Sequence, residues 1–230
     1  MLHNDGEHMN YQDISNTIKE ILKLETSPVS VKLFQNEEEA KSILEKTESI
    51  MHCQAIITAS KGYSFYGSGT EIGCQIGAGI LGLNEISEDT LNGTKFNQMN
   101  VTSTQENGKK LIDSVPKYDK RIEAIGYMPL EKTKIKPDVI VIIAKPRQIF
   151  DLIRANAYPE GKKMDNSVGG TQSLCGDIVI NSIITNEAHI SFGCMGSHMA
   201  TELQEDHVII GIPITKLEEI TNSLKIQNQR

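Results

Sequence analysis

Four cysteines are the residues of this sequence whose type and spacing could do chemistry together: Cys53, Cys74, Cys175 and Cys194. Any one of them alone is most simply a small buried hydrophobic side chain, since free cysteine often packs that way. All four, however, fall inside a segment that occurs twice in the chain. This pattern favours a shared role as thiolate ligands of one metal centre.

The repeat consists of two similar stretches, one from Cys53 to Cys74 and one from Cys175 to Cys194. In each, a cysteine lies early on an apolar helix, a short strand with an aromatic residue follows, and a Gly-Cys pair ends the unit. If the two copies fold alike about a pseudo-twofold axis, they direct their four sulfurs toward a common centre. The repeat thus predicts a two-plus-two set of ligands.

Thiolates are soft ligands that select iron-sulfur clusters, zinc or copper(I). Structural zinc usually uses tight Cys-x-x-Cys pairs, and this sequence has none. We therefore expect a [4Fe-4S] cluster, with zinc as the alternative. Glycines beside the cysteines, whose backbone N–H groups could reach the sulfurs, are the expected cofactor-binding residues: Gly73, Gly77, Gly193 and Gly196.

Such a centre predicts a redox, electron-transfer or cofactor-maturation role, and the sequence leaves open whether the protein is an enzyme. Two alternatives remain. One is a cleft that binds a small molecule or a tetrapyrrole metallocofactor, and the other is a structural zinc site with the function elsewhere. The expected partner is a redox protein or a small-molecule ligand, and a homo-oligomer is compatible with the sequence.

Composition excludes several classes of partner. The chain of 230 residues has a formal net charge of −7 with both signs spread along it, so it offers no basic patch for nucleic acid or for an anionic membrane surface. The first sixteen residues do not form a signal peptide, and the longest apolar run, Val139 to Ala144, is too short to cross a bilayer. We expect a cytoplasmic protein with reduced cysteines.

Periodicity and turn signals predict an α/β fold, with α+β as the alternative. A flexible tail, 1–15, precedes a single domain, 16–230, in which pseudo-repeats at about 29–84 and 138–200 surround a mixed sheet. The predicted strands are 29–34, 63–66, 121–128, 138–144, 189–192 and 208–212. The predicted helices lie near 14–24, 36–46, 47–62, 106–114 and 173–185, with two more that begin at Pro146 and after a cap at Thr215.

Other polar residues have simpler explanations. His52, His189 and His198 lie near the cysteines in sequence and could be ligands or proton carriers, but such histidines are more often surface or core residues. Lys145, Arg147 and Arg154 follow the most buried strand, where an anion could bind, although a solvated helix face explains them as well.

These segments together resemble the ArCR family, a domain of unknown function found in archaea and bacteria. The resemblance covers the chain from about Asn16 to Leu224. It rests on Cys53-Gln-Ala, Gly73-Cys74 with its trailing glycines, Lys145-Pro146, and Phe192-Gly193-Cys194-Met-Gly196-Ser. The chain has His198 where an arginine is expected in many relatives. The resemblance implies metal or cluster binding and supplies no reaction.

Overall fold

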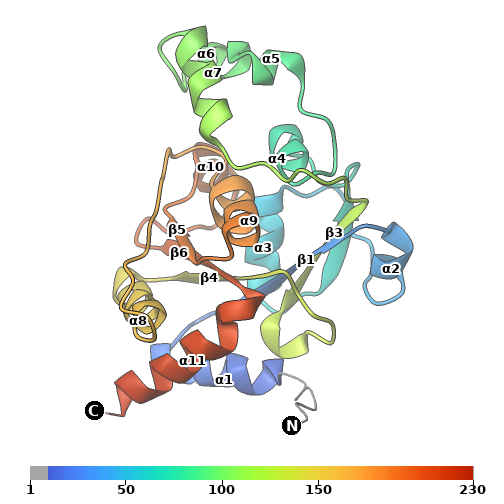
Figure 1. The fold of residues 1–230 in the computed structure, drawn as a ribbon. Helices are drawn as coiled ribbons and strands as arrows, with labels where there is room; N and C mark the ends of the chain where they lie inside the picture. The colour runs from blue at the N-terminus through green and yellow to red at the C-terminus, as the bar shows by residue number, and fades with distance from the viewer. Residues whose placement is uncertain (1–9, 230) are drawn as a thin grey trace, which may run out of the picture.

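The computed structural model describes residues 10–229 and has a six-stranded sheet with helices on both faces (Figure 1). The strands lie in the order β2-β3-β1-β4-β6-β5, and every neighbouring pair is antiparallel. Their bounds are β1 Val29–Phe34, β2 Phe65–Ser68, β3 Ala124–Pro129, β4 Val139–Ala144, β5 His189–Ser191 and β6 Val208–Pro213. The α/β class is confirmed, but parallel pairing is confined to two isolated bridges, so the named strands do not form the mixed sheet that we predicted.

The strand order is symmetric about the centre of the sheet. β1 and β4 pair in the middle, β3 and β6 flank them, and β2 and β5 form the two edges. Each half of the chain therefore runs from a central strand to an edge strand and back to the strand between them. The repeat includes this third strand, so each unit extends beyond the predicted bounds of 29–84 and 138–200.

Alternation along the central strands divides the core into two layers. Val139 and Val141 of β4 pack into the core above the sheet in Figure 1, while Ile140 and Ile142 pack into the core below it. Side chains in a strand point alternately to opposite faces, so a continuous β-branched run suits a strand that is covered on both sides. β4 is such a strand.

Three helices cover the lower face in Figure 1: α1 Tyr11–Leu22, α8 Pro146–Ala157 and α11 Ile214–Asn228. Residues 1–9 of the predicted tail lie outside the described residues, and α1 begins at Tyr11 because the Asn10 side chain accepts hydrogen bonds from the first turn. Thr215 does not cap α11. It lies inside the helix, and its hydroxyl donates to Asn186.

The upper face carries the repeated segments and their connections. Helix α2, Glu37–Lys41, lies beside them. The helices of this face are α3 His52–Ser60, α4 Gln75–Ile80, η2 Ser173–Ile180, which has π-type hydrogen bonding, α9 Asn181–Thr185 and α10 Met195–Ala200. No helix within residues 10–229 is both long and apolar enough to cross a membrane.

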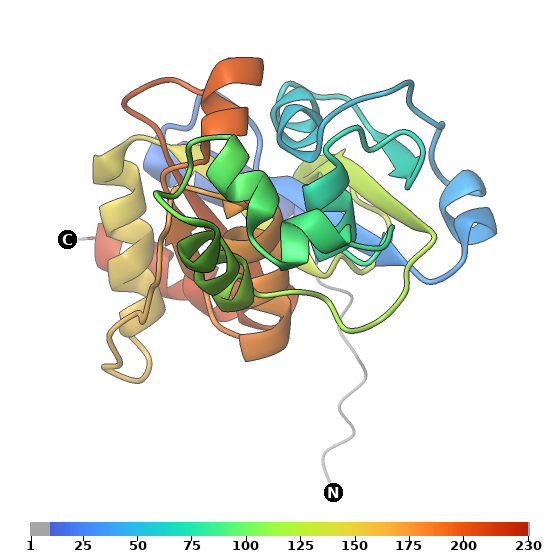
Figure 2. The same ribbon diagram turned by 90° about the horizontal axis from the view of Figure 1, so that it is seen from above.

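A small helical segment lies above this face, and of its three helices the sequence predicted only the last, at 106–114. It consists of α5 Glu88–Leu91, α6 Thr94–Gln98 and α7 Gln105–Ser114, and seen from above it extends across the middle of the molecule (Figure 2). Phe96 and Ile112 of this segment are buried in the upper core. The segment is held together where Gly93 and Gly108 meet, since a Cβ at either would lie under 2.5 Å from the other's backbone or its neighbours.

We predict that Gly93→Ala lowers the free energy of unfolding by about 2 kcal/mol or more, because it combines a left-handed backbone at φ 85° with a backbone clash. Gly161→Ala is the matched control. It also has a positive φ, at 68°, but no atom lies within 4 Å of its Cβ position, so its cost is about 1 kcal/mol. Urea denaturation of both variants measures the difference, and equal losses would contradict the close packing of α6 on α7.

Candidate metal centre

All four cysteines line one cavity of about 400 Å³ on the upper side of the sheet. Cys53 and Cys175 are buried, and Cys74 and Cys194 are partly exposed at its surface. None is in a disulfide. The two halves of the repeat therefore contribute one buried and one partly exposed thiol each.

Every cysteine lies at the beginning of a helix. Cys53 is the second residue of α3, and Cys74 is the N-cap of α4. In the other half, Cys175 is in the first turn of η2, and Cys194 is the N-cap of α10. Backbone N–H groups in the first turn of a helix have no partner within it, so these positions direct N–H groups toward the thiols.

The sulfurs are close neighbours. A Cβ at Gly77 would lie 3.2 Å from Sγ of Cys74 and 3.6 Å from Sγ of Cys175, so both atoms flank this one glycine. Charge on Cys194 raises the pKa of Cys53, Cys74 and Cys175 alike. Because such an effect needs short distances inside a protein, all four thiols belong to one electrostatic unit.

Burial keeps the thiols of Cys53, Cys74 and Cys175 protonated in the absence of a cation. It raises the pKa of Cys53 from its ordinary value of 9.0 to about 12, and nearby thiols add to the effect. Burial likewise raises the pKa of Cys74, and it raises that of Cys175 further. Backbone N–H groups of Gln54, Gly77 and Gly176 favour the thiolates at Cys53, Cys74 and Cys175 respectively but do not reverse these shifts.

The four predicted glycines divide into two pairs. Gly77 and Gly196 line the cavity. Gly73 and Gly193 are not part of its wall but precede Cys74 and Cys194. Gly193 has φ 89°, which favours glycine, and the N–H of Gly73 donates to the carbonyl of Ile50. The second pair thus orients the chain ahead of each cysteine.

His52 is the other titratable side chain of the cavity wall. It is 3% exposed, and its Nδ1 lies 2.8 Å from the hydroxyl of Tyr127 on β3. Burial lowers the pKa of His52 to about 4, a change that the backbone of Leu174 partly opposes. Nε2 is buried and makes no hydrogen bond within residues 10–229. The imidazole is therefore neutral, with one nitrogen unpaired.

The sequence did not predict the remaining wall of the cavity. Phe96, Met99, Asn100 and Val101 come from α6 and the turn after it, four residues come from a loop, 169–172, and Ile76, Leu174 and Met195 come from the cysteine-bearing helices α4, η2 and α10. Gln172 in this loop has φ 49°, and its side-chain oxygen accepts from the thiol of Cys175 at 3.4 Å. Because a residue other than glycine rarely adopts a left-handed conformation, the sequence did not indicate this turn at Gln172.

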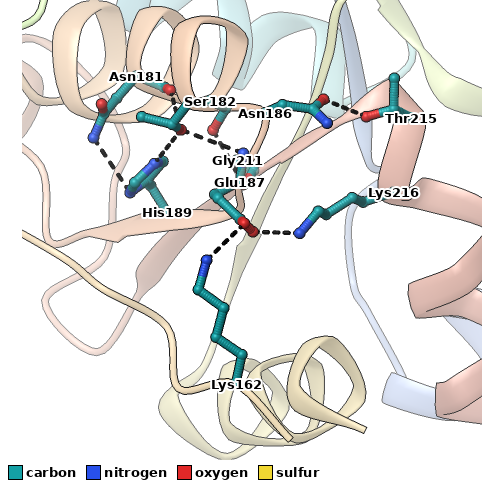
Figure 3. A network of polar contacts seen from close by, with 10 residues as sticks. Lys162, Asn181, Ser182, Asn186, Glu187, His189, Gly211, Thr215 and Lys216 are labelled. Atoms are coloured by element: carbon teal, nitrogen blue, oxygen red, sulfur yellow. Dashed lines mark hydrogen bonds and ion pairs between the residues drawn. The ribbon is translucent and has the colours of Figure 1, made fainter. Parts of the chain in front are cut away.

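The other polar candidates lie away from this cavity. Figure 3 shows His189 beside Asn181, together with the contacts of Glu187 with Lys162 and Lys216. The hydroxyl of Thr185 also pairs with the His189 ring. His198 pairs with the carbonyl of Phe192. Arg147 and Arg154 both contact Asp151 and the ring of Phe150 on α8, and Lys145 pairs with Glu25. These contacts are structural.

No three histidine, cysteine, aspartate or glutamate side chains in residues 10–229 are grouped as they would be around a single metal ion. A tetrahedral zinc site holds each thiolate about 2.3 Å from one atom. The thiols of this cavity are neighbours without that arrangement.

Comparison with known proteins agrees with the resemblance stated from the sequence. The model of the family described as uncharacterised ArCR, a domain of unknown function, matches residues 17–223. The chain belongs to the ArCR family. Another similar protein is the uncharacterized protein MJ0308 of Methanocaldococcus jannaschii, 28% identical over 211 residues that cover 90% of this chain and 91% of the relative. No solved structure matches this ArCR protein.

We predict that iodoacetamide alkylates Cys74 and Cys194 of the reduced, metal-free protein at least about tenfold faster than Cys53 and Cys175, because the first pair is partly exposed and the second is buried. Since only the thiolate reacts and the pKa of Cys53 is about 12, its rate should still rise about tenfold per pH unit between pH 8 and 10. Mass spectrometry of tryptic peptides gives the four rates. Uniform rates with a plateau near pH 9 would contradict the burial described.

Proposed function

We propose that this ArCR protein binds a [4Fe-4S] cluster through Cys53, Cys74, Cys175 and Cys194 and serves in electron transfer, redox chemistry or cofactor maturation. The observation that carries the proposal is the convergence of all four thiols on one cavity, each from the start of a helix. Cysteine thiolates hold such clusters, and N–H groups near the sulfurs help set their reduction potential.

The arrangement of the thiols favours a cluster over zinc. One zinc ion would require four sulfurs drawn around a single atom, and the described residues contain no such group. A cubane presents a separate iron to each thiolate and accepts sulfurs that lie farther apart. Gly77, whose missing side chain leaves space between Cys74 and Cys175, fits a bulky inorganic core in the middle of the cavity.

The cluster would lie close enough to the surface to exchange electrons with a partner. Cys74 and Cys194 are partly exposed. Met99 and Met195 line the same cavity and are about half exposed, so its mouth is largely apolar. Flexible methionines suit contact with another protein, and we infer that a redox protein docks there. Reduced thiols at this mouth are consistent with a cytoplasmic location.

Anaerobic purification tests the cluster directly. We expect about four iron and four sulfide per chain and broad visible absorption that reduction bleaches. Each of Cys53→Ser, Cys74→Ser, Cys175→Ser and Cys194→Ser should lower the iron content, since the ligands act on one centre. The matched control is Ser223→Ala, which changes a small buried polar residue on α11. Zinc without sulfide, or the sharp bands of a tetrapyrrole, would refute the proposal.

Two glycines of the cavity wall give a second, finer test. A Cβ at Gly77 would approach Sγ of Cys74 to 3.2 Å and enter the space between two sulfurs, whereas a Cβ at Gly196 would meet Sγ of Cys194 at an ordinary 3.8 Å. We predict that Gly77→Ala reduces the iron and sulfide content at least severalfold, while Gly196→Ala retains most of both. Circular dichroism checks that each variant folds. Full loading of folded Gly77→Ala would place the cluster elsewhere.

A further inference from the structure

The side chain of Gln172 contacts one of the four thiols directly. The thiol of Cys175 donates to the side-chain oxygen of Gln172 at 3.4 Å, and within residues 10–229 this is the one hydrogen bond of that side chain. Gln172 lines the cavity, and Cys175, at 6% exposed, is the least exposed of the four cysteines. Gln172 therefore supplies a polar side-chain contact at the sulfur that water reaches least.

The backbone of Gln172 has a conformation that suits glycine better than glutamine. Gln172 is the N-cap of η2, with φ 49° and ψ 36°, and a side chain in this left-handed region costs free energy that glycine avoids. Its carbonyl accepts from the N–H of Gly176 at 2.8 Å, so the same residue begins η2. Since glycine could make that backbone contact without strain, what glutamine adds at this position is its side chain.

The carboxamide of Gln172 can contact Cys175 both as a thiol and as a thiolate. Its oxygen accepts from a thiol, and its NH2 group donates to a thiolate. A cysteine that binds a metal loses its proton, after which the carboxamide oxygen would face a negative sulfur. A half-turn about the last side-chain torsion exchanges the oxygen for the NH2 group. No other hydrogen bond of this side chain within the described residues opposes that turn.

The first half of the repeat has no equivalent of this contact. Gln172 lies three positions before Cys175, whereas the residue three positions before Cys53 is Ile50, whose side chain has no N–H or O–H group. Backbone N–H groups oppose the rise in pKa at Cys53 and at Cys175 alike. The side-chain donor is thus an addition at one of two otherwise similar ligands.

We propose that Gln172 is a positioning residue that acts through Cys175: it donates its side-chain N–H to the thiolate and raises the reduction potential of the bound cluster. This inference rests on the proposed function and names the residue that tunes it. Reduction adds one electron from the redox partner, and therefore negative charge, without breaking a bond. A hydrogen bond to the sulfur stabilises the more negative state and so favours reduction.

Reduction potentials of anaerobic, cluster-loaded samples test the role of Gln172. Gln172→Met keeps the length of the side chain but has no N–H. It should lower the equilibrium constant for reduction about tenfold, which is about 59 mV for one electron. The matched control is Asn100→Leu. Asn100 also lines the cavity with a left-handed backbone, at φ 55°, but it makes no hydrogen bond to a sulfur within residues 10–229. Its potential should stay that of the native protein.

Gln172→Gly separates the side chain from the backbone. It relieves the left-handed strain, so the metal-free variant should unfold at a urea concentration no lower than the native protein does. Once loaded, it should show the same lowered potential as Gln172→Met. A purely structural role of Gln172 predicts the reverse: a lower urea midpoint in the metal-free protein and a native potential in the loaded one. That result would overturn the inference.

Iron and sulfide analysis, done first on every sample, keeps the two proposals distinguishable. Native protein without iron and sulfide refutes the proposed function, and this inference with it. Loaded native protein whose potential equals that of loaded Gln172→Met and Gln172→Gly refutes the role of Gln172 alone.

Discussion

Four neighbouring thiols in the wall of a mostly apolar cavity, two of them buried and two partly exposed, are the constraint on which the rest of this structure depends. Raising the pKa of Cys53 from 9.0 to about 12 corresponds to about 4 kcal/mol of added cost for its thiolate. Several such thiolates cannot be held together by a few N–H groups alone. Binding of a metal to a set of thiolates contributes on the order of 10–16 kcal/mol for structural zinc, which is the scale required. Without a cation, burial instead favours the neutral thiols of Cys53, Cys74 and Cys175.

The symmetric sheet explains how distant cysteines reach this cavity. β1 and β4 pair antiparallel at the centre. The cysteine-bearing helix α3 packs on β1, its counterpart η2 packs on β4, and the two helices contact each other. The cysteine side chain is short, so the backbone at the start of a helix determines where its sulfur lies. Two copies of one short unit therefore suffice to position four ligands, and the helical segment between α4 and β3 is free to differ from its counterpart.

The central strands and the longer helices could be predicted from the sequence, whereas several short helices around the cavity could not. The β-branched run of 139–144 and the Pro146 that follows it defined a strand and a helix start, and β1 was predicted at its observed bounds. Helices α4 and α10 were not predicted, because they contain Gly77, Gly79 and Gly196 and glycine has a low helix propensity. The short helices α5 and α6 have too few turns to show a period, so Phe96 and Val101 could not be placed at the cavity.

The two halves of the repeat differ in the residues next to their cysteines, so the two sides of the cavity are not equivalent. The first half has His52 next to Cys53 and bonded to Tyr127, whereas the second half places Leu174 next to Cys175. The extra helical segment also belongs to the first half alone. The first half thus has a buried polar pair, His52 and Tyr127, while each half contributes one partly exposed cysteine and one half-exposed methionine to the cavity wall. The repeat gathers the thiols, and the departures from it make the two sides of the cavity chemically different.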